Sequence, residues 1–167
     1  THNEVARTGL RDVEYGEGIY IGTSQRRWDA VTWGDPDRSD GIVIQGNTIT
    51  DAGAEAIEAK EGTSGGAIID NVIDGHLSGS RALGWVLVTG SDWTISGNSG
   101  SDAVTNGFSA MSWEDWGVGN VFRDNDGATD ASGYGLWVQD NTSATVTVAC
   151  NNWVTAEKGI ANVFCSP

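Results

Sequence analysis

The chain has 167 residues, 38% of them hydrophobic, which is enough for a single domain over residues 1–167 with a sizeable core. Its 9 Lys and Arg against 23 Asp and Glu give a formal net charge of -14. A charge of this sign opposes binding to nucleic acid or anionic lipid, so neither is an expected partner. No run of about 18 apolar residues occurs, which argues against a membrane-spanning segment.

The two cysteines of the chain, Cys150 and Cys165, lie near its C-terminus. Their spacing allows one disulfide that closes a C-terminal cap over residues 150–165, and a disulfide favours a secreted protein. Two unpaired buried thiols are the alternative, because cysteine is often a small core residue.

Turn and strand residues dominate the composition, with 24 Gly against 2 Pro and many Val, Ile, Asn and Thr. Gly and Asn supply corners, and β-branched residues fill strands. Helical periodicity is weak: residues 3–11 form one helical candidate, and a turn of helix is expected around Glu157.

A two-part unit repeats along the chain. Its first part is a short apolar strand after a glycine or another small residue, at residues 18–21, 56–59, 84–88, 107–110 and 135–138. Its second part is an apolar strand that ends at an asparagine, at residues 42–47, 67–71, 93–98, 118–120 and 146–151. The terminal asparagines are spaced by 24, 27, 22 and 31 residues, a period typical of a solenoid.

Stacked coils about 4.8 Å apart would pair every strand with those above and below it and bury a continuous apolar column. We therefore predict an all-β fold, a parallel β-helix of about five coils, with the asparagines as structural corners. A β-sandwich shares the strand spacing but leaves the recurrent Gly-Asn corner unexplained.

This pattern resembles the right-handed parallel β-helix of the pectate-lyase-like superfamily over nearly the whole chain. The resemblance is carried by residues 55–66, residues 71–75 and the C-terminal segment 150–165, which are similar to secreted microbial β-helix repeat proteins. The superfamily includes polysaccharide lyases, glycoside hydrolases, epimerases, phage tailspikes and adhesins, so the resemblance implies the fold more strongly than the chemistry. The Gly-His-Gly and Arg-x-Lys motifs of polygalacturonase-like members are absent.

Aligning the first strands places a row of side chains on the outward face of one sheet, where an extended sugar chain could lie. The members of this row are Tyr20, Glu58, Lys60, Trp137 and Gln139, with Ser109 and Met111 between them. The coil that begins at Trp85 fits this alignment in either register.

The resemblance implies a Lys or Arg base that removes the proton α to a uronate carboxylate, commonly with Ca²⁺ neutralising that carboxylate. Lys60 is the candidate base, with Glu58 beside it and Arg81 as a further cation near a polyanionic substrate. The alternative is a surface salt bridge of Lys60 with Glu58 and Glu61, which would raise the lysine pKa.

Two further features suit carbohydrate chemistry. Trp113 and Trp116 enclose two acidic residues in an expected loop beside the groove, and they are candidate platforms for sugar rings. A hydrolase would need two carboxylates about 5 to 10 Å apart. The candidates are Glu58, Asp92, Glu114 and Asp115, and a solvated acidic face is the alternative.

Two acidic segments have spacings that suit Ca²⁺. In one, Asp124, Asp126 and Asp130 surround a glycine, and in the other Asp35, Asp37 and Asp40 follow each other closely. Plain turns explain both segments as well, because Asp, Asn and Gly favour turns.

The sequence thus predicts a secreted β-helix protein that acts on extracellular polysaccharide, with a lyase as the leading mechanism. The alternative is a non-catalytic carbohydrate-binding or self-assembling solenoid. Either the chain is part of a longer β-helix, or the open N-terminal end of the solenoid is a site of self-association.

Overall fold

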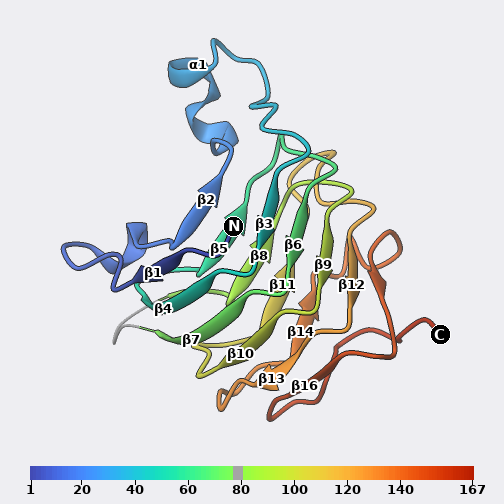
Figure 1. Ribbon diagram of the computed structural model, residues 1–167. Helices are drawn as coiled ribbons and strands as arrows, with labels where there is room; N and C mark the ends of the chain where they lie inside the picture. Colours follow the sequence, from blue (N-terminus) through green and yellow to red (C-terminus); the bar gives the residue numbers. More distant parts are fainter. Residues whose placement is uncertain (77–80) are drawn as a thin grey trace.

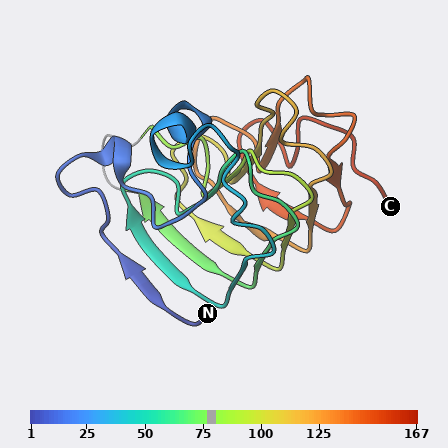
Figure 2. The same ribbon diagram turned by 90° about the horizontal axis from the view of Figure 1, so that it is seen from above.

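The computed structural model describes residues 1–76 and 81–167 and shows a parallel β-helix (Figures 1 and 2). Three sheets run along the stack, and every strand pairs in parallel with the strands of the neighbouring coils. The predicted all-β solenoid is confirmed, and the expected number of coils is close to the five or six strands of each sheet.

The first predicted strand units form one five-stranded sheet, with the order β14-β11-β8-β5-β2. Its strands are β2 (Ile19–Ile21), β5 (Ile57–Ala59), β8 (Val86–Val88), β11 (Phe108–Ala110) and β14 (Leu136–Val138). The second units form another five-stranded sheet, of β3 (Val43–Gln45), β6 (Ala67–Ile69), β9 (Thr94–Ser96), β12 (Val121–Arg123) and β15 (Thr147–Val148). The strand expected at residues 118–120 is wrong, because β12 begins at Val121.

A third, six-stranded sheet was not predicted. Its strands are β1 (Glu4–Ala6), β4 (Thr48–Ala52), β7 (Val72–His76), β10 (Ser99–Ser101), β13 (Asp126–Ala128) and β16 (Trp153–Thr155). The inward positions of β10 and β13 are Gly100 and Gly127, in register with Ile73 and Val154. Gly100 makes room for Trp85, whose ring atoms would lie 2.5 Å from a Cβ there. The apolar alternation that identifies a strand is therefore missing from β10 and β13.

The helical predictions at both ends of the chain are wrong. Residues 3–11 contain β1, because Val5 pairs with Ile49 in the sheet, and Glu157 lies in a turn. Helical structure occurs instead in η1 (Val13–Tyr15), η2 (Gln25–Arg27) and α1 (Trp28–Val31). η2 and α1 belong to a segment between β2 and β3 that projects from the stack (Figure 1).

The projecting segment is anchored by Trp28. Its side chain is 6% exposed, and its indole Nε1 donates to the Thr23 carbonyl oxygen at 2.7 Å. The ring packs so closely on Gly62 that a Cβ there would lie 2.8 Å from it. This anchor gives the non-repeating segment a fixed base on the first coils.

A ladder of buried asparagines runs along the corner between two sheets. Each asparagine donates its backbone N–H and its Nδ2 to the Oδ1 of the asparagine in the next coil, over distances of 2.8–3.1 Å. The members are Asn3, Asn47, Asn71, Asn98, Asn125 and Asn152. The prediction that asparagines form structural corners is thus confirmed, and three of the six positions, Asn47, Asn71 and Asn98, were predicted correctly.

The ladder positions expected at Asn120 and Asn151 are wrong. Asn120 is buried at another corner, where its Oδ1 accepts from the Trp93 N–H at 2.9 Å. Asn151 is exposed and hydrogen-bonds Asp124. A buried and an exposed asparagine that lie one or a few positions apart cannot be told apart by spacing alone.

The C-terminal segment folds back on the last coil and is held by the Cys150–Cys165 disulfide, which confirms that pairing. The Leu136 N–H donates to the Ile160 carbonyl at 2.7 Å, and the Ser166 N–H donates to the Val148 carbonyl at 2.8 Å. This segment therefore occupies part of the sheet edge next to β14 and β15. In the described part of the chain, no helix is long and apolar enough to cross a membrane.

We expect Asn98→Ala to lower the free energy of unfolding by about 3 to 5 kcal/mol, because several buried polar groups lose their partners at once. The lost contacts include the two donors of Asn71 and the Ile68 carbonyl. Guanidinium chloride unfolding measures this. The matched control is the exposed Asn151→Ala, which we expect to cost less than about 1 kcal/mol. Equal losses in the two variants would contradict a stabilising ladder.

Candidate functional site

The outward face of the sheet formed by β2, β5, β8, β11 and β14 carries the predicted row. Tyr20 pairs in register with Glu58, and Ser109 pairs with Trp137. Leu87 completes the row between them, which settles the register of the third coil. The alignment made from the sequence is therefore confirmed, although Ser109 is fully buried.

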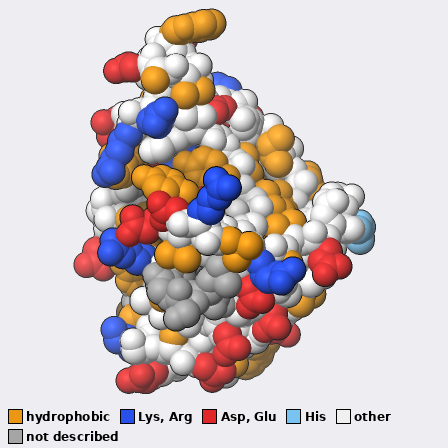
Figure 3. Space-filling model, turned by 90° about the vertical axis from the view of Figure 1, so that its left-hand side faces the viewer, with side chains coloured by type: hydrophobic (Ala, Val, Ile, Leu, Met, Phe, Trp, Pro, Cys, Tyr) orange, Lys and Arg blue, Asp and Glu red, His pale blue; other side chains and the backbone are white. Residues whose placement is uncertain are grey.

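Next to this row lies a cavity of about 230 Å³. Leu87 and Met111 contribute apolar surface to it, and Lys60 lies at its edge. Arg26 and Trp113, from segments outside the repeating strands, line it as well. In Figure 3, basic and acidic side chains flank an apolar area beneath the projecting α1 segment.

Lys60 lies between two acidic side chains. Its Nζ is 2.9 Å from Glu58 Oε1 and 3.4 Å from Glu61 Oε2, and its side chain is 15% exposed. Burial lowers the pKa of Lys60, but the charges of Glu58 and Glu61 and the hydrogen bond to Glu58 outweigh it and hold the pKa above its ordinary value. The salt bridge considered as the alternative is therefore present, and Lys60 is an ammonium group at neutral pH.

Glu58 is 6% exposed, and burial raises its pKa from 4.5 to about 7, against the nearby charge of Lys60. Glu17, Glu55 and Glu58 form the one group of three acidic or metal-ligating side chains in the described residues whose ligand atoms all lie within 4.8 Å of one another. These carboxylates are the ones that a hard cation would use. Glu58, however, already contacts Lys60, and Glu55 accepts from the Leu83 N–H at 2.9 Å.

Tyr20 lies beside Lys60 at the start of the row. Its side chain is 44% exposed, and burial raises its pKa to about 12 although the charge of Lys60 lowers it. Its hydroxyl group is thus protonated over the physiological range and can donate a proton.

The role of Glu61 was missed by the sequence analysis, which treated it only as a neighbour of Lys60. Glu61 is 2% exposed, and its Oε1 accepts from the Gln25 N–H at 2.7 Å and from the Ser24 Oγ at 3.1 Å. Burial raises the pKa of Glu61, but the hydrogen bond from the Gln25 N–H, the charge of Lys60 and the hydrogen bond from Thr89 bring it below the ordinary value. The Glu61 carboxylate thus connects Lys60, the candidate base, to the start of the projecting segment.

Trp113 and Trp116 form a tight hairpin in which each backbone N–H donates to the other's carbonyl, at 3.2 and 3.0 Å. The Arg26 guanidinium lies 5.3 Å from the Trp113 ring centroid, and the Arg38 guanidinium lies 5.0 Å from the Trp116 ring centroid. Trp113 lines the cavity and Trp116 does not. The loop position predicted for the pair is confirmed.

Arg81 pairs with a different carboxylate from the two that pair with Lys60. Its side chain is 80% exposed, its Nη1 is 2.6 Å from Glu14 Oε1, and it does not line the cavity. Leu83, two residues further along the chain, does line the cavity, and its carbonyl accepts from the Ser109 Oγ at 2.9 Å. At the far end of the row, Trp137 is half-buried, and Gln139 Oε1 accepts from the Ser112 N–H at 3.0 Å.

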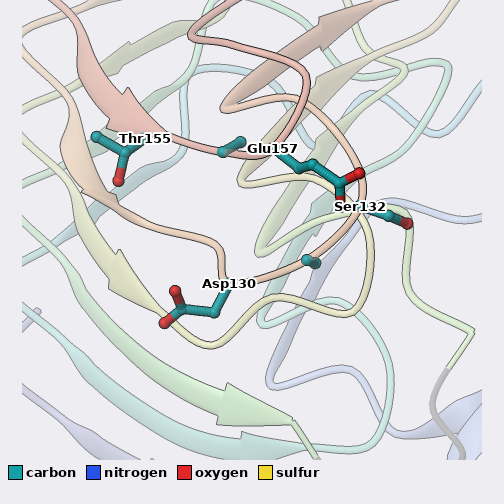
Figure 4. A pocket seen from close by; sticks show the side chains of 6 residues that line it. Asp130, Ser132, Thr155 and Glu157 are labelled. Carbon is teal, nitrogen blue, oxygen red and sulfur yellow. The ribbon is translucent and has the colours of Figure 1, made fainter.

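The predicted calcium residues Asp124, Asp126 and Asp130 are not brought together. Asp126 begins strand β13, and the other two lie before and after this extended strand. Asp130 borders a hollow with Glu157, and Figure 4 shows their carboxyl groups pointing apart. Asp124 and Asp130 have left-handed backbone on either side of the strand, with φ of 57° and 51°, and all three carboxylates are exposed.

In the second acidic segment, hydrogen bonds already use the carboxylates of Asp37 and Asp40. Asp37 accepts from Thr23 Oγ1 at 2.7 Å and from Ser39 Oγ at 2.8 Å, and these bonds lower its pKa. Asp40 accepts from the Ser64 N–H at 2.7 Å. Calcium binding therefore stays a prediction.

Two of the hydrolase candidates lie in different surroundings. Glu114 accepts from Gln25 Nε2 at 2.7 Å on the hairpin, whereas Glu58 lies with Glu17 and Glu55. The carboxylates nearest to Glu58 are therefore residues of its own coil and of the coil before it.

The chain matches the family described as right handed beta helix region over residues 3–165, and it belongs to this family. Among solved structures, it is similar to an alginate lyase from Paenibacillus sp. str. FPU-7, with a TM-score of 0.79 and 26% identity. The similarity covers 95% of this chain and 53% of that one, so the chain spans about half the length of that lyase. No match was found among curated protein sequences.

The raised pKa of Glu58 predicts a pH-dependent stability. The folded protein holds this proton more tightly than the unfolded chain, so the stabilising contribution is complete below about pH 4.5 and is lost as the pH rises through about 7. We expect the free energy of unfolding of the wild type, relative to Glu58→Gln, to fall by about 2 kcal/mol between pH 5 and pH 8. Chemical unfolding at several pH values measures the difference; a constant difference would rule out the shifted pKa.

Proposed function

We propose that the chain is the catalytic β-helix of a polysaccharide lyase that cleaves a uronate polymer by β-elimination. The observation that carries the proposal is the placement of Lys60 and Tyr20 side by side on the outward face of the sheet, next to a cavity with an apolar floor. The similarity to an alginate lyase over 95% of the chain supports the same class of reaction.

Each of the two residues has one task in the proposed reaction. The neutral Lys60 amine removes the proton at C5 of the uronate, and the electrons of the C5–H bond form the double bond between C4 and C5. The C4–O4 bond breaks, and O4 takes its proton from the Tyr20 hydroxyl. The Lys60 ammonium then returns a proton to the Tyr20 phenolate, which restores both groups.

Glu58 and Glu61 set the protonation of the base. Both pair with Lys60 and hold it as an ammonium group in the resting protein. Only the fraction of molecules with a neutral amine can react, and this fraction grows as the pH rises toward the pKa of Lys60. The mechanism therefore implies an alkaline enzyme.

Alginate is the proposed substrate to test first, because the similar solved structure is an alginate lyase. An extracellular location is part of the proposal and is supported by the Cys150–Cys165 disulfide. A net charge of -14 repels a polyanion, so the cations at the cavity or a bound Ca²⁺ must attract it locally.

We expect incubation with alginate to increase the absorbance at about 235 nm, as the unsaturated product forms, and Lys60→Ala to reduce the rate at least about 1000-fold. The matched control is Lys158→Ala, because Lys158 is the other lysine of the chain, is exposed and lies next to Tyr134. It should retain full activity. Parallel assays with Ca²⁺ and with chelator test the calcium prediction.

Other outcomes of this assay point to the alternatives. New reducing ends without absorbance at 235 nm would favour hydrolysis by the Glu17, Glu55 and Glu58 carboxylates, two of which are buried. Binding of glycan without cleavage, or concentration-dependent self-association, would favour the binding or structural function.

The pKa of Lys60 gives a second prediction. We expect kcat/KM to rise about tenfold per pH unit between pH 7 and pH 10, because the neutral amine is the minor form throughout this range. Initial rates over this range, with circular dichroism to verify that the protein stays folded, measure the slope. A rate that is flat to pH 9 and then falls would show that Lys60 acts as an ammonium group.

A further inference from the structure

Arg26 reaches the cavity from the projecting segment, as its neighbour Ser24 does. It lies in η2, within the projecting segment, and not on a repeating strand. Its guanidinium stacks on Trp113, from a hairpin that follows β11 three coils further along the stack. Both residues line the cavity that contains Lys60, so two insertions meet over one sheet.

Gln25 holds the two insertions together. Its Nε2 donates to Glu114 Oε2 at 2.7 Å, and its Oε1 accepts from the indole Nε1 of Trp113. Its backbone N–H donates to Glu61 Oε1 at 2.7 Å, next to Lys60. The position of Arg26 is thus tied to the hairpin on one side and to the candidate base on the other.

Arg26 forms no ion pair in the described part of the chain. In residues 1–76 and 81–167, no carboxylate oxygen lies within 4.0 Å of its guanidinium, whereas Lys60 has two carboxylate partners. Lys60 and Arg26 are the cations that line the cavity. Arg26 is therefore the cation with free donors toward an incoming anion.

We propose that Arg26 is the uronate-recognition residue of the site, binding the carboxylate of the sugar whose C5 proton is removed, and that Trp113 is its positioning residue. This inference rests on the proposed function. A guanidinium presents paired N–H donors that fit a carboxylate, and neutralising that carboxylate stabilises the negative charge that develops when the proton leaves. A neutral sugar or a methyl ester offers no such anion.

A second arginine–tryptophan pair supplies the matched control. Arg38 stacks on Trp116 at 5.0 Å, also joins the projecting segment to the hairpin, and does not line the cavity. Losing Arg38 should weaken the contact between the two insertions as much as losing Arg26, without removing a cation from the cavity.

The test compares Arg26→Gln and Arg38→Gln on alginate and on alginate methyl ester. We expect Arg26→Gln to lower kcat/KM on alginate at least about 30-fold and to change the rate on the methyl ester less than about threefold. Arg38→Gln should stay within about twofold of the wild type on both polymers. Equal losses of Arg26→Gln on both polymers would overturn the proposal, since they would show a structural role.

The role of Trp113 is tested by the same comparison of activity on alginate with activity on its methyl ester. Trp113→Leu removes the ring under the guanidinium and should lower activity on alginate but not on the methyl ester, whereas Trp113→Phe keeps a ring and should restore most of the loss. An equal effect of Trp113→Leu on both polymers would contradict its positioning role.

A binding measurement separates this inference from the proposed function. If the wild type cleaves neither polymer, the lyase proposal fails, but titration calorimetry with an alginate oligosaccharide still reports on Arg26. In the conservative variant Tyr20→Phe, adding Arg26→Gln should weaken binding at least about tenfold. Unchanged affinity would overturn recognition by Arg26.

Discussion

The hydrogen bonds between buried asparagines in successive coils are the interaction on which the rest of the structure depends. Each link uses a backbone N–H and a side-chain amide of one coil and the Oδ1 of the next, over 2.8–3.1 Å. Buried amides without these partners would each be costly, so a coil that slips by one residue is strongly disfavoured. The ladder therefore fixes the register in which the three sheets stack, and with it the row that contains Tyr20 and Glu58.

The candidate site combines this fixed row with segments that do not repeat. The strands supply Tyr20 and Glu58 in register, with Lys60 directly after β5, and Leu87 of β8 lines the cavity. The projecting segment and the Trp113 hairpin supply Arg26 and its ring partner. Burying Lys60 with two glutamates is unfavourable for folding unless every charge is paired, and the geometry satisfies this condition by pairing Lys60 with both. Such a charged group on an otherwise regular solenoid is the local departure from the folding pattern that functional sites commonly show.

The sequence predicted the parts of the fold that carry an apolar signal. Repeated strands such as residues 18–21 and 56–59 identified the solenoid, and their alignment correctly placed Tyr20 beside Glu58. The six-stranded sheet was missed because Gly100 and Gly127 take inward positions there, so the alternation that marks a strand is absent. Asn120 could not be distinguished from the ladder, because it is a buried asparagine at a different corner.

The sequence predicted the residues of the candidate site on or next to the strands and the tryptophans of the hairpin, but it did not predict Arg26. Lys60 and Tyr20 followed from the register, whereas Arg26 lies in an insertion and meets Trp113 across 87 positions of the chain, as no local pattern can show. Conversely, Asp124, Asp126 and Asp130 have the spacing of a calcium loop, but the extended strand β13 begins at Asp126 and separates it from Asp130, and Asp124 precedes the strand. A short acidic motif can bind a cation only if the backbone between its residues brings the carboxylates together. Here the stacking of the coils determines the backbone conformation of that segment.

The most direct test of the account is a crystal structure of the Tyr20→Phe variant with a bound uronate oligosaccharide. The account predicts a sugar chain on the outward face of the β2-β5-β8-β11-β14 sheet, with a C5 atom within about 3.5 Å of Lys60 Nζ and the adjacent carboxylate on the Arg26 guanidinium. A sugar chain bound to another face of the solenoid, with Lys60 still enclosed by Glu58 and Glu61, would contradict it.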